Sequence, residues 1–182
     1  MSKAADSLLQ KAREAIARNE FQKASEAAAA ATQIDGTRID IWRTLSSIYF
    51  QLGQSAKCSD ALRAALKLNP DEPNLFHDLG ISLKREGRFG EAEAMLRESW
   101  RRFPTQALPS ILSLSDLLCQ TGRRAEAEQI LRFAMERGPK IFDPMRDLTN
   151  MLIQEGRYAE AAALTEDFIK RNGQSIATLE QL

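Results

Sequence analysis

Four glycines recur along this 182-residue chain at nearly constant intervals of 34, 35 and 34 residues: Gly53, Gly87, Gly122 and Gly156. A proline follows the first three at the same distance, at Pro70, Pro104 and Pro139. A period of this length is typical of a solenoid, in which one small helical unit stacks on its neighbours. We expect five units, at about residues 5–38, 39–72, 73–107, 108–141 and 142–175.

The first half of each unit has the apolar spacing of an amphipathic helix. Its fourth, seventh, eighth and eleventh positions fall on one stripe of a helix with 3.6 residues per turn, which is the stripe that such a helix buries. In the second unit, these positions are Trp42, Leu45, Ser46 and Tyr49. The fourth position is large and apolar in every unit: Leu8, Trp42, Phe76, Ile111 and Met145.

The recurring glycines mark a turn between two helices. Asn19 takes this place in the first unit, and a helix that ends in a left-handed residue prefers glycine or asparagine. In the second helix, one position stays small, as expected where two helices approach closely: Ala24, Cys58, Ala92, Ala127 and Ala161. The second helices should stop at a glycine or proline: Gly36, Pro70, Pro104, Pro139 and Gly173.

This pattern resembles the tetratricopeptide repeat family over almost the whole chain. The second unit matches the family pattern at Trp42, Leu45, Tyr49, Gly53, Ala65 and Pro70, and the same register holds in all five units. The resemblance implies an all-α fold, a right-handed α-solenoid of stacked antiparallel helix hairpins that forms a single domain over residues 1–182.

Both ends of the array depart from the pattern. Lys11 and Ala15 replace large apolar residues in the first unit, which suits a terminal unit with only one neighbour. Residues 176–182 are expected to begin a further helix, in which Leu179 and Leu182 take apolar positions. Two interpretations stay open: this segment is a capping helix, or it is the start of a sixth repeat in a fragment of a longer protein.

The composition excludes several classes of partner. The 25 Lys and Arg residues are balanced by 25 Asp and Glu residues, so the basic excess of a nucleic-acid-binding protein is missing. Neither a signal peptide nor an apolar stretch of about 20 residues is present, so we expect no membrane insertion. Cys58 and Cys119 form no CxxC pair, which favours a reducing, cytoplasmic setting.

In the family, the first helices of the repeats line a concave groove. The resemblance therefore implies a peptide-binding groove with rows of cations and carboxylates, a few apolar positions, and Leu9 of the first unit on the same face. The residues expected to line it are Asp40, Arg43, Thr44, Ser47, Phe50, Asn74, His77, Asp78, Ile81, Lys84, Asp116, Asp143, Arg146, Asp147 and Asn150. The clamp with which co-chaperone members hold a chaperone's C-terminal carboxylate is not expected, because the paired cations are missing and Asp78 would repel the ligand.

Enzymatic chemistry has little support in the sequence. His77 is the only histidine, so we expect no histidine-based metal cluster and no catalytic triad. Cys58 stands at the close-packing position, and the glycine-rich turn at Gly87 lacks the GK[ST] ending of a phosphate-binding loop. We expect a non-enzymatic protein without catalytic residues, metal or cofactor.

The leading hypothesis is a protein–protein interaction scaffold, an adaptor that binds a peptide or protein segment in the groove. One alternative is an N-terminal recognition domain of a larger enzyme, such as a glycosyltransferase or sulfotransferase. A second is a self-assembling scaffold that associates through its C-terminal end, around Leu152, Phe168 and Ile169.

Overall fold

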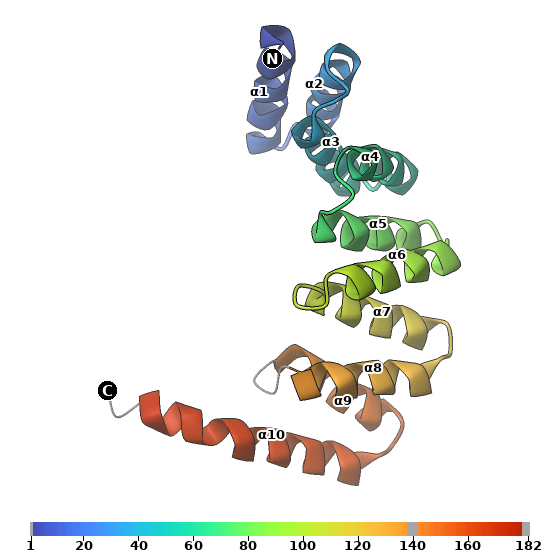
Figure 1. Ribbon diagram of the computed structural model, residues 1–182, viewed down its shortest axis with the longest axis vertical. Helices are drawn as coiled ribbons and strands as arrows, with labels where there is room; N and C mark the ends of the chain where they lie inside the picture. Colours follow the sequence, from blue (N-terminus) through green and yellow to red (C-terminus); the bar gives the residue numbers. More distant parts are fainter. Residues whose placement is uncertain (1, 138–141, 180–182) are drawn as a thin grey trace. The chain divides into compact units, whose positions relative to one another are not determined.

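The structure is a computed structural model that describes residues 2–137 and 142–179, and its elements in this part of the chain are all α-helices. They form two compact units, Met1–Pro104 and Thr105–Leu182, here called unit 1 and unit 2. Unit 1 contains α1 (Lys3–Ala17), α2 (Phe21–Ile34), α3 (Ile39–Gln51), α4 (Ser55–Leu68), α5 (Pro73–Arg85) and α6 (Phe89–Arg102) (Figure 1). Unit 2 contains α7 (Leu108–Gln120), α8 (Arg124–Arg137), α9 (Phe142–Gln154) and α10 (Tyr158–Leu179).

Each unit is a stack of helix hairpins. In unit 1, α1 packs on α2, α3 on α4 and α5 on α6, and consecutive hairpins meet through α2 with α3 and α4 with α5. In unit 2, α7 packs on α8, α8 on α9, and α9 on α10. The prediction of an all-α helical repeat is confirmed.

The turns between paired helices have the predicted left-handed residue. After α3, Gly53 has a φ of 69°. Its N–H donates to the carbonyl of Phe50 at 3.2 Å, and the N–H of Gln54 donates to the carbonyl of Tyr49 at 2.9 Å. These two bonds satisfy carbonyls that the end of a helix leaves unpaired. The same conformation recurs, with φ between 58° and 80°, at Asn19, Gly87, Gly122 and Gly156.

Replacing Gly87 by alanine should lower the free energy of unfolding by about 1 kcal/mol. A Cβ at Gly87 meets nothing within 4 Å, so the loss comes from the backbone conformation alone, at a φ of 76°. Urea denaturation followed by circular dichroism measures it. Asn19→Gly relaxes the same conformation and should be neutral or slightly stabilising. A Gly87→Ala variant as stable as the natural chain would contradict this account of the turn.

The buried stripe and the close-packing position also follow the prediction. All four leucines at the seventh position, Leu45, Leu79, Leu114 and Leu148, are buried, whereas Trp42 and Tyr49 on the same stripe are half-buried. The small residues of the second helices are buried in every hairpin, with exposures of 0–4%: Ala24, Cys58, Ala92, Ala127 and Ala161. Because these residues are small, the two helices of a hairpin can pack closely.

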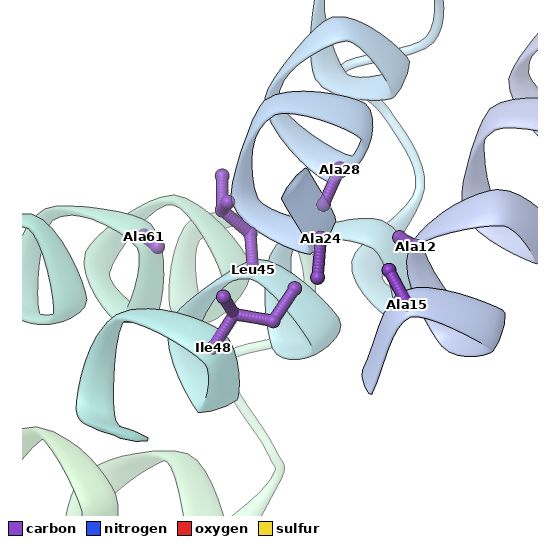
Figure 2. Packing of buried hydrophobic residues seen from close by; sticks show 7 residues of the cluster. All are labelled: Ala12, Ala15, Ala24, Ala28, Leu45, Ile48 and Ala61. Atoms are coloured by element: carbon purple, nitrogen blue, oxygen red, sulfur yellow. The ribbon is translucent and has the colours of Figure 1, made fainter. Parts of the chain in front are cut away.

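The first hairpin has an alanine-rich core (Figure 2). Ala12 and Ala15 of α1 face Ala24 and Ala28 of α2, beside two larger side chains from α3, Leu45 and Ile48. Lys11 is exposed, as suits a terminal hairpin with one neighbour. Most of the apolar volume in this cluster therefore comes from α3.

Two arginines of unit 1 fix the segments that precede α3 and α5. Arg38, just before α3, pairs with Asp6 of α1 and with Asp40 of α3, the latter at 2.7 Å. Arg102 of α6 pairs with Asp71 and donates to the carbonyl of Pro70 at 2.8 Å. Arg38 therefore connects the first hairpin to the start of α3, whereas Arg102 connects the end of α6 to the segment that leads into α5 of its own hairpin.

The predicted helix stops hold at Gly36, Pro70 and Pro104, because α2, α4 and α6 end two residues before them. The predicted stop at Gly173 is wrong, since α10 continues to Leu179. A glycine inside a helix costs about 1 kcal/mol, which weakens a helix without breaking it as a proline does. Residues 176–179 thus extend α10 and do not begin a separate helix, whereas Pro139 and Leu182 lie outside the described residues.

Candidate functional site

A pocket of about 400 Å³ opens between α3 and α5 of unit 1. Six of the predicted groove residues line it: Arg43, Ser47 and Phe50 from α3, and His77, Asp78 and Ile81 from α5. On α3 these residues are spaced i, i+4 and i+7, which places them on one face of the helix. His77 and Ile81 have the same i, i+4 spacing on α5. The repeat register therefore sets two similar stripes side by side.

The floor of the pocket is made of core residues outside the predicted groove set. Cys58 and Leu62 of α4 and Leu75 of α5 are 1–2% exposed, and Ser46 of α3 is 6% exposed. Burial raises the pKa of the Cys58 thiol, which keeps it protonated and a poor nucleophile. The floor is thus mainly apolar, beneath a polar rim.

The charged side chains at the rim differ in whether they have partners. The ring of His77 lies 3.2 Å from a carboxylate oxygen of Asp78, measured from Nδ1 to Oδ1. The guanidinium of Arg85 lies over the ring of Phe50, 3.7 Å from its centroid, in a cation–π contact between α5 and α3. Arg43 has no ion-pair partner among the side chains that the structure describes.

Four other predicted groove residues of unit 1 are not part of this lining. The nearby guanidinium of Arg38 lowers the pKa of Asp40, whose carbonyl accepts a bond from the Thr44 hydroxyl at 2.8 Å. Asn74 is exposed in the first turn of α5, and its amide lies 3.4 Å from Glu72. Lys84 is half-buried on α5. The prediction for Leu9 is wrong, because this side chain is 2% exposed in a cluster with Ala5, Ala31 and Ile41.

In unit 2, the cation predicted to line the groove is Arg146, and it forms ion pairs with carboxylates of its own helix. Arg146 of α9 pairs with Asp143 at 2.9 Å and with Asp147 at 3.0 Å. These contacts raise the pKa of Arg146. On α7, Asp116 accepts a hydrogen bond from Gln120 at 3.0 Å, and Asn150 of α9 is exposed. The charges that were predicted to form one row thus differ between the units, because Arg146 of unit 2 is paired within its own helix.

The three residues named for self-association also differ in exposure. Leu152 is fully buried and Phe168 is half-buried, while Ile169 of α10 is 60% exposed. Leu152 therefore belongs to the core of unit 2 and is not available to a second copy.

Within the described residues, no three His, Cys, Asp or Glu side chains come together in a way that could hold a metal ion. Of the helices that the structure describes, none is both long and apolar enough to span a membrane. Burial raises the pKa of the Cys119 thiol, which lies 3.7 Å from the sulfur of Met151.

Comparisons with known proteins agree with this architecture. Residues 39–82 and 73–98 match two models of the tetratricopeptide repeat. Human tetratricopeptide repeat protein 7B is 28% identical over 133 residues, or 73% of this chain, but the chain spans only 15% of that relative's length. Among solved structures, MamA has a TM-score of 0.79 at 12% identity, covering 97% of this chain and 96% of MamA.

YrrB, described as a TPR protein with an unusual peptide-binding site, has a TM-score of 0.66 at 16% identity and covers 96% of this chain and 89% of its own. At these identities, the likeness to MamA and YrrB concerns the fold. The helix hairpins with their left-handed turns, the two family models over residues 39–98 and the human relative together support a tetratricopeptide repeat family for this chain.

Proposed function

We propose that this protein is an interaction scaffold that binds a peptide segment of a partner protein in the pocket between α3 and α5. The observation that carries the proposal is the pocket itself, which has an apolar floor beneath polar rims on two neighbouring helices. Such a surface suits a peptide that inserts an apolar side chain and hydrogen-bonds along the rims.

Two further points support this assignment. Phe50 and Ile81 remain partly exposed at the pocket, whereas the leucines of α5, Leu75, Leu79 and Leu83, are buried. A structure of the same fold, YrrB, is described as having a peptide-binding site, which supports the use of this architecture for peptide binding.

Filling the pocket tests the proposal. Peptides selected from a random displayed library on the natural chain would be measured by fluorescence anisotropy against a Ser47→Trp variant. Ser47 is exposed at the rim, so a tryptophan there should block the pocket without disturbing the core. We expect the Kd of the selected peptides to rise by roughly tenfold or more.

The matched control is Ser7→Trp, which adds the same side chain at an exposed position of α1 outside the pocket. This variant should bind the selected peptides like the natural chain. Equal binding by all three proteins would place the peptides elsewhere and contradict the proposed site.

A further inference from the structure

Among the arginines whose side chains the structure describes, few lack a carboxylate partner. Most arginines whose side chains are described form ion pairs, as Arg88 does with Glu91 at 2.7 Å and Arg132 with Glu128 at 2.7 Å. Among the described side chains, the exceptions are Arg13, Arg18, Arg43 and Arg85. Arg43 lines the pocket together with Asp78, whereas Arg85 lies over Phe50 without a paired carboxylate among the described side chains.

The guanidinium of Arg85 is held in a defined position by the ring of Phe50. At 3.7 Å from the ring centroid, it rests on the face of the ring. A guanidinium stacked in this way keeps the N–H groups at its edges available, in the fork geometry that matches a carboxylate. Arg85 is exposed and has no carboxylate partner among the described side chains, so these donors are open to a ligand.

The two ends of the pocket differ in their suitability for an anion. Asp78 and Arg85 are seven residues apart on α5, about 10 Å along the helix and on the same face. Asp78 lines the pocket with Arg43 and would repel an incoming carboxylate. The end at Phe50 and Arg85 is therefore the one that favours negative charge.

A peptide has room to continue beyond this end. Ser47 lines the main pocket and also a second hollow of about 270 Å³, formed with residues of the α1–α2 turn that include Asn19 and Phe21. Because hollows lie on both sides of α3, a bound peptide can continue past Phe50 and need not end there. This points to a side-chain carboxylate, in the middle of the peptide, as the group bound by Arg85.

We propose that the Arg85–Phe50 stack is a receptor for an aspartate or glutamate side chain, and that the ligand is an acidic peptide segment with an apolar residue beside the acidic one. This inference rests on the proposed function, because the apolar residue occupies the pocket floor at Leu62 and Leu75. Charge complementarity then selects among apolar peptides those that carry a carboxylate at the right place.

Three pools of synthetic twelve-residue peptides test the inference. Each pool has a central leucine flanked on both sides, two residues away, by glutamate, glutamine or lysine, with the other positions random and both termini blocked. The natural chain should bind the glutamate pool about tenfold more tightly than the glutamine pool, and the lysine pool least. The preference should weaken as salt is added, because exposed charges are screened.

Variants of Arg85 distinguish the effect of its planar guanidinium from the effect of its positive charge. Arg85→Gln should abolish the preference for glutamate, and Arg85→Lys should lose most of it, since lysine keeps the charge without the planar fork. Arg18→Gln is the matched control: it removes an equally unpaired, exposed arginine beyond the end of α1 and should keep the preference. Equal binding of the glutamate and glutamine pools, or equal losses in Arg85→Gln and Arg18→Gln, would overturn the inference.

A fourth pool, of glutamine peptides with a free C-terminal carboxylate, tests the source of the charge. If it regains full affinity through Arg85, the chain terminus is the ligand and the side-chain proposal is wrong. The Ser47→Trp variant separates this inference from the proposed function. If Ser47→Trp loses binding for every pool while the natural chain binds the glutamate and glutamine pools equally, the pocket stands and only the carboxylate receptor is overturned. No loss for any pool would overturn both.

Discussion

The variant Leu45→Ala is expected to lower the free energy of unfolding of unit 1 by about 3 to 4 kcal/mol, near the middle of the range for buried leucines. Leu45 is 3% exposed and packs in a cluster that otherwise consists largely of alanines, among them Ala12, Ala24 and Ala28. Alanine side chains are too short to move into the space that the leucine leaves. The cavity should therefore persist, and its cost adds to the lost burial of apolar surface.

Urea denaturation monitored by circular dichroism measures this loss. Leu68→Ala is the matched control, because Leu68 lies at the end of α4 and is 41% exposed. This variant should lose less than about 1 kcal/mol. Similar losses in both variants would contradict the packing described for the first two hairpins.

The variant Gly80→Val should destabilise unit 1 by about 2 to 3 kcal/mol through overpacking. Gly80 of α5 is buried against α6, and a Cβ built on it lies 2.8 Å from the Cγ and Cδ2 atoms of Leu96. Leu96 is fully buried and cannot turn outward, so the two helices of this hairpin must separate. The gain in helix propensity over glycine is only a few tenths of a kcal/mol and does not offset the clash.

Gly90→Val, in the first turn of α6, provides the comparison, because a Cβ there meets nothing within 4 Å. That variant should be as stable as the natural chain or slightly more so. A Gly80→Val variant of unchanged stability would show that the third hairpin is packed more loosely than described here.

Those parts of the fold that depend on local chemistry were predictable from the sequence. A left-handed turn requires glycine or asparagine, and a close helix contact requires a small residue. Gly53 therefore predicted the turn after α3, and Cys58 predicted the close contact in the same hairpin. The end of α10 was not predictable in this way. Gly173 is compatible both with a helix end and with a helix interior, and only the surrounding chain decides between them.

The candidate site was predictable in part. The repeat register placed Arg43, Phe50, His77 and Ile81 on one surface, and all four line the pocket. The floor was missed because a residue such as Leu62 has the same apolar signal whether it fills a core or underlies a pocket.

The difference in charge between the two units depends on side-chain pairing. The pairing of Arg146 with Asp143 could have been recognised from their i, i+3 spacing. The stack of Arg85 on Phe50 joins different helices and needs the tertiary structure.

The most direct test of peptide binding between α3 and α5 is chemical-shift mapping. A selected peptide would be titrated into the ¹⁵N-labelled chain, and amide shifts followed by two-dimensional NMR. We expect the largest changes at lining residues such as Ser47, Phe50 and Ile81, with small changes on α6, which does not line the pocket. Changes centred on α6, or confined to unit 2, would contradict the proposed site.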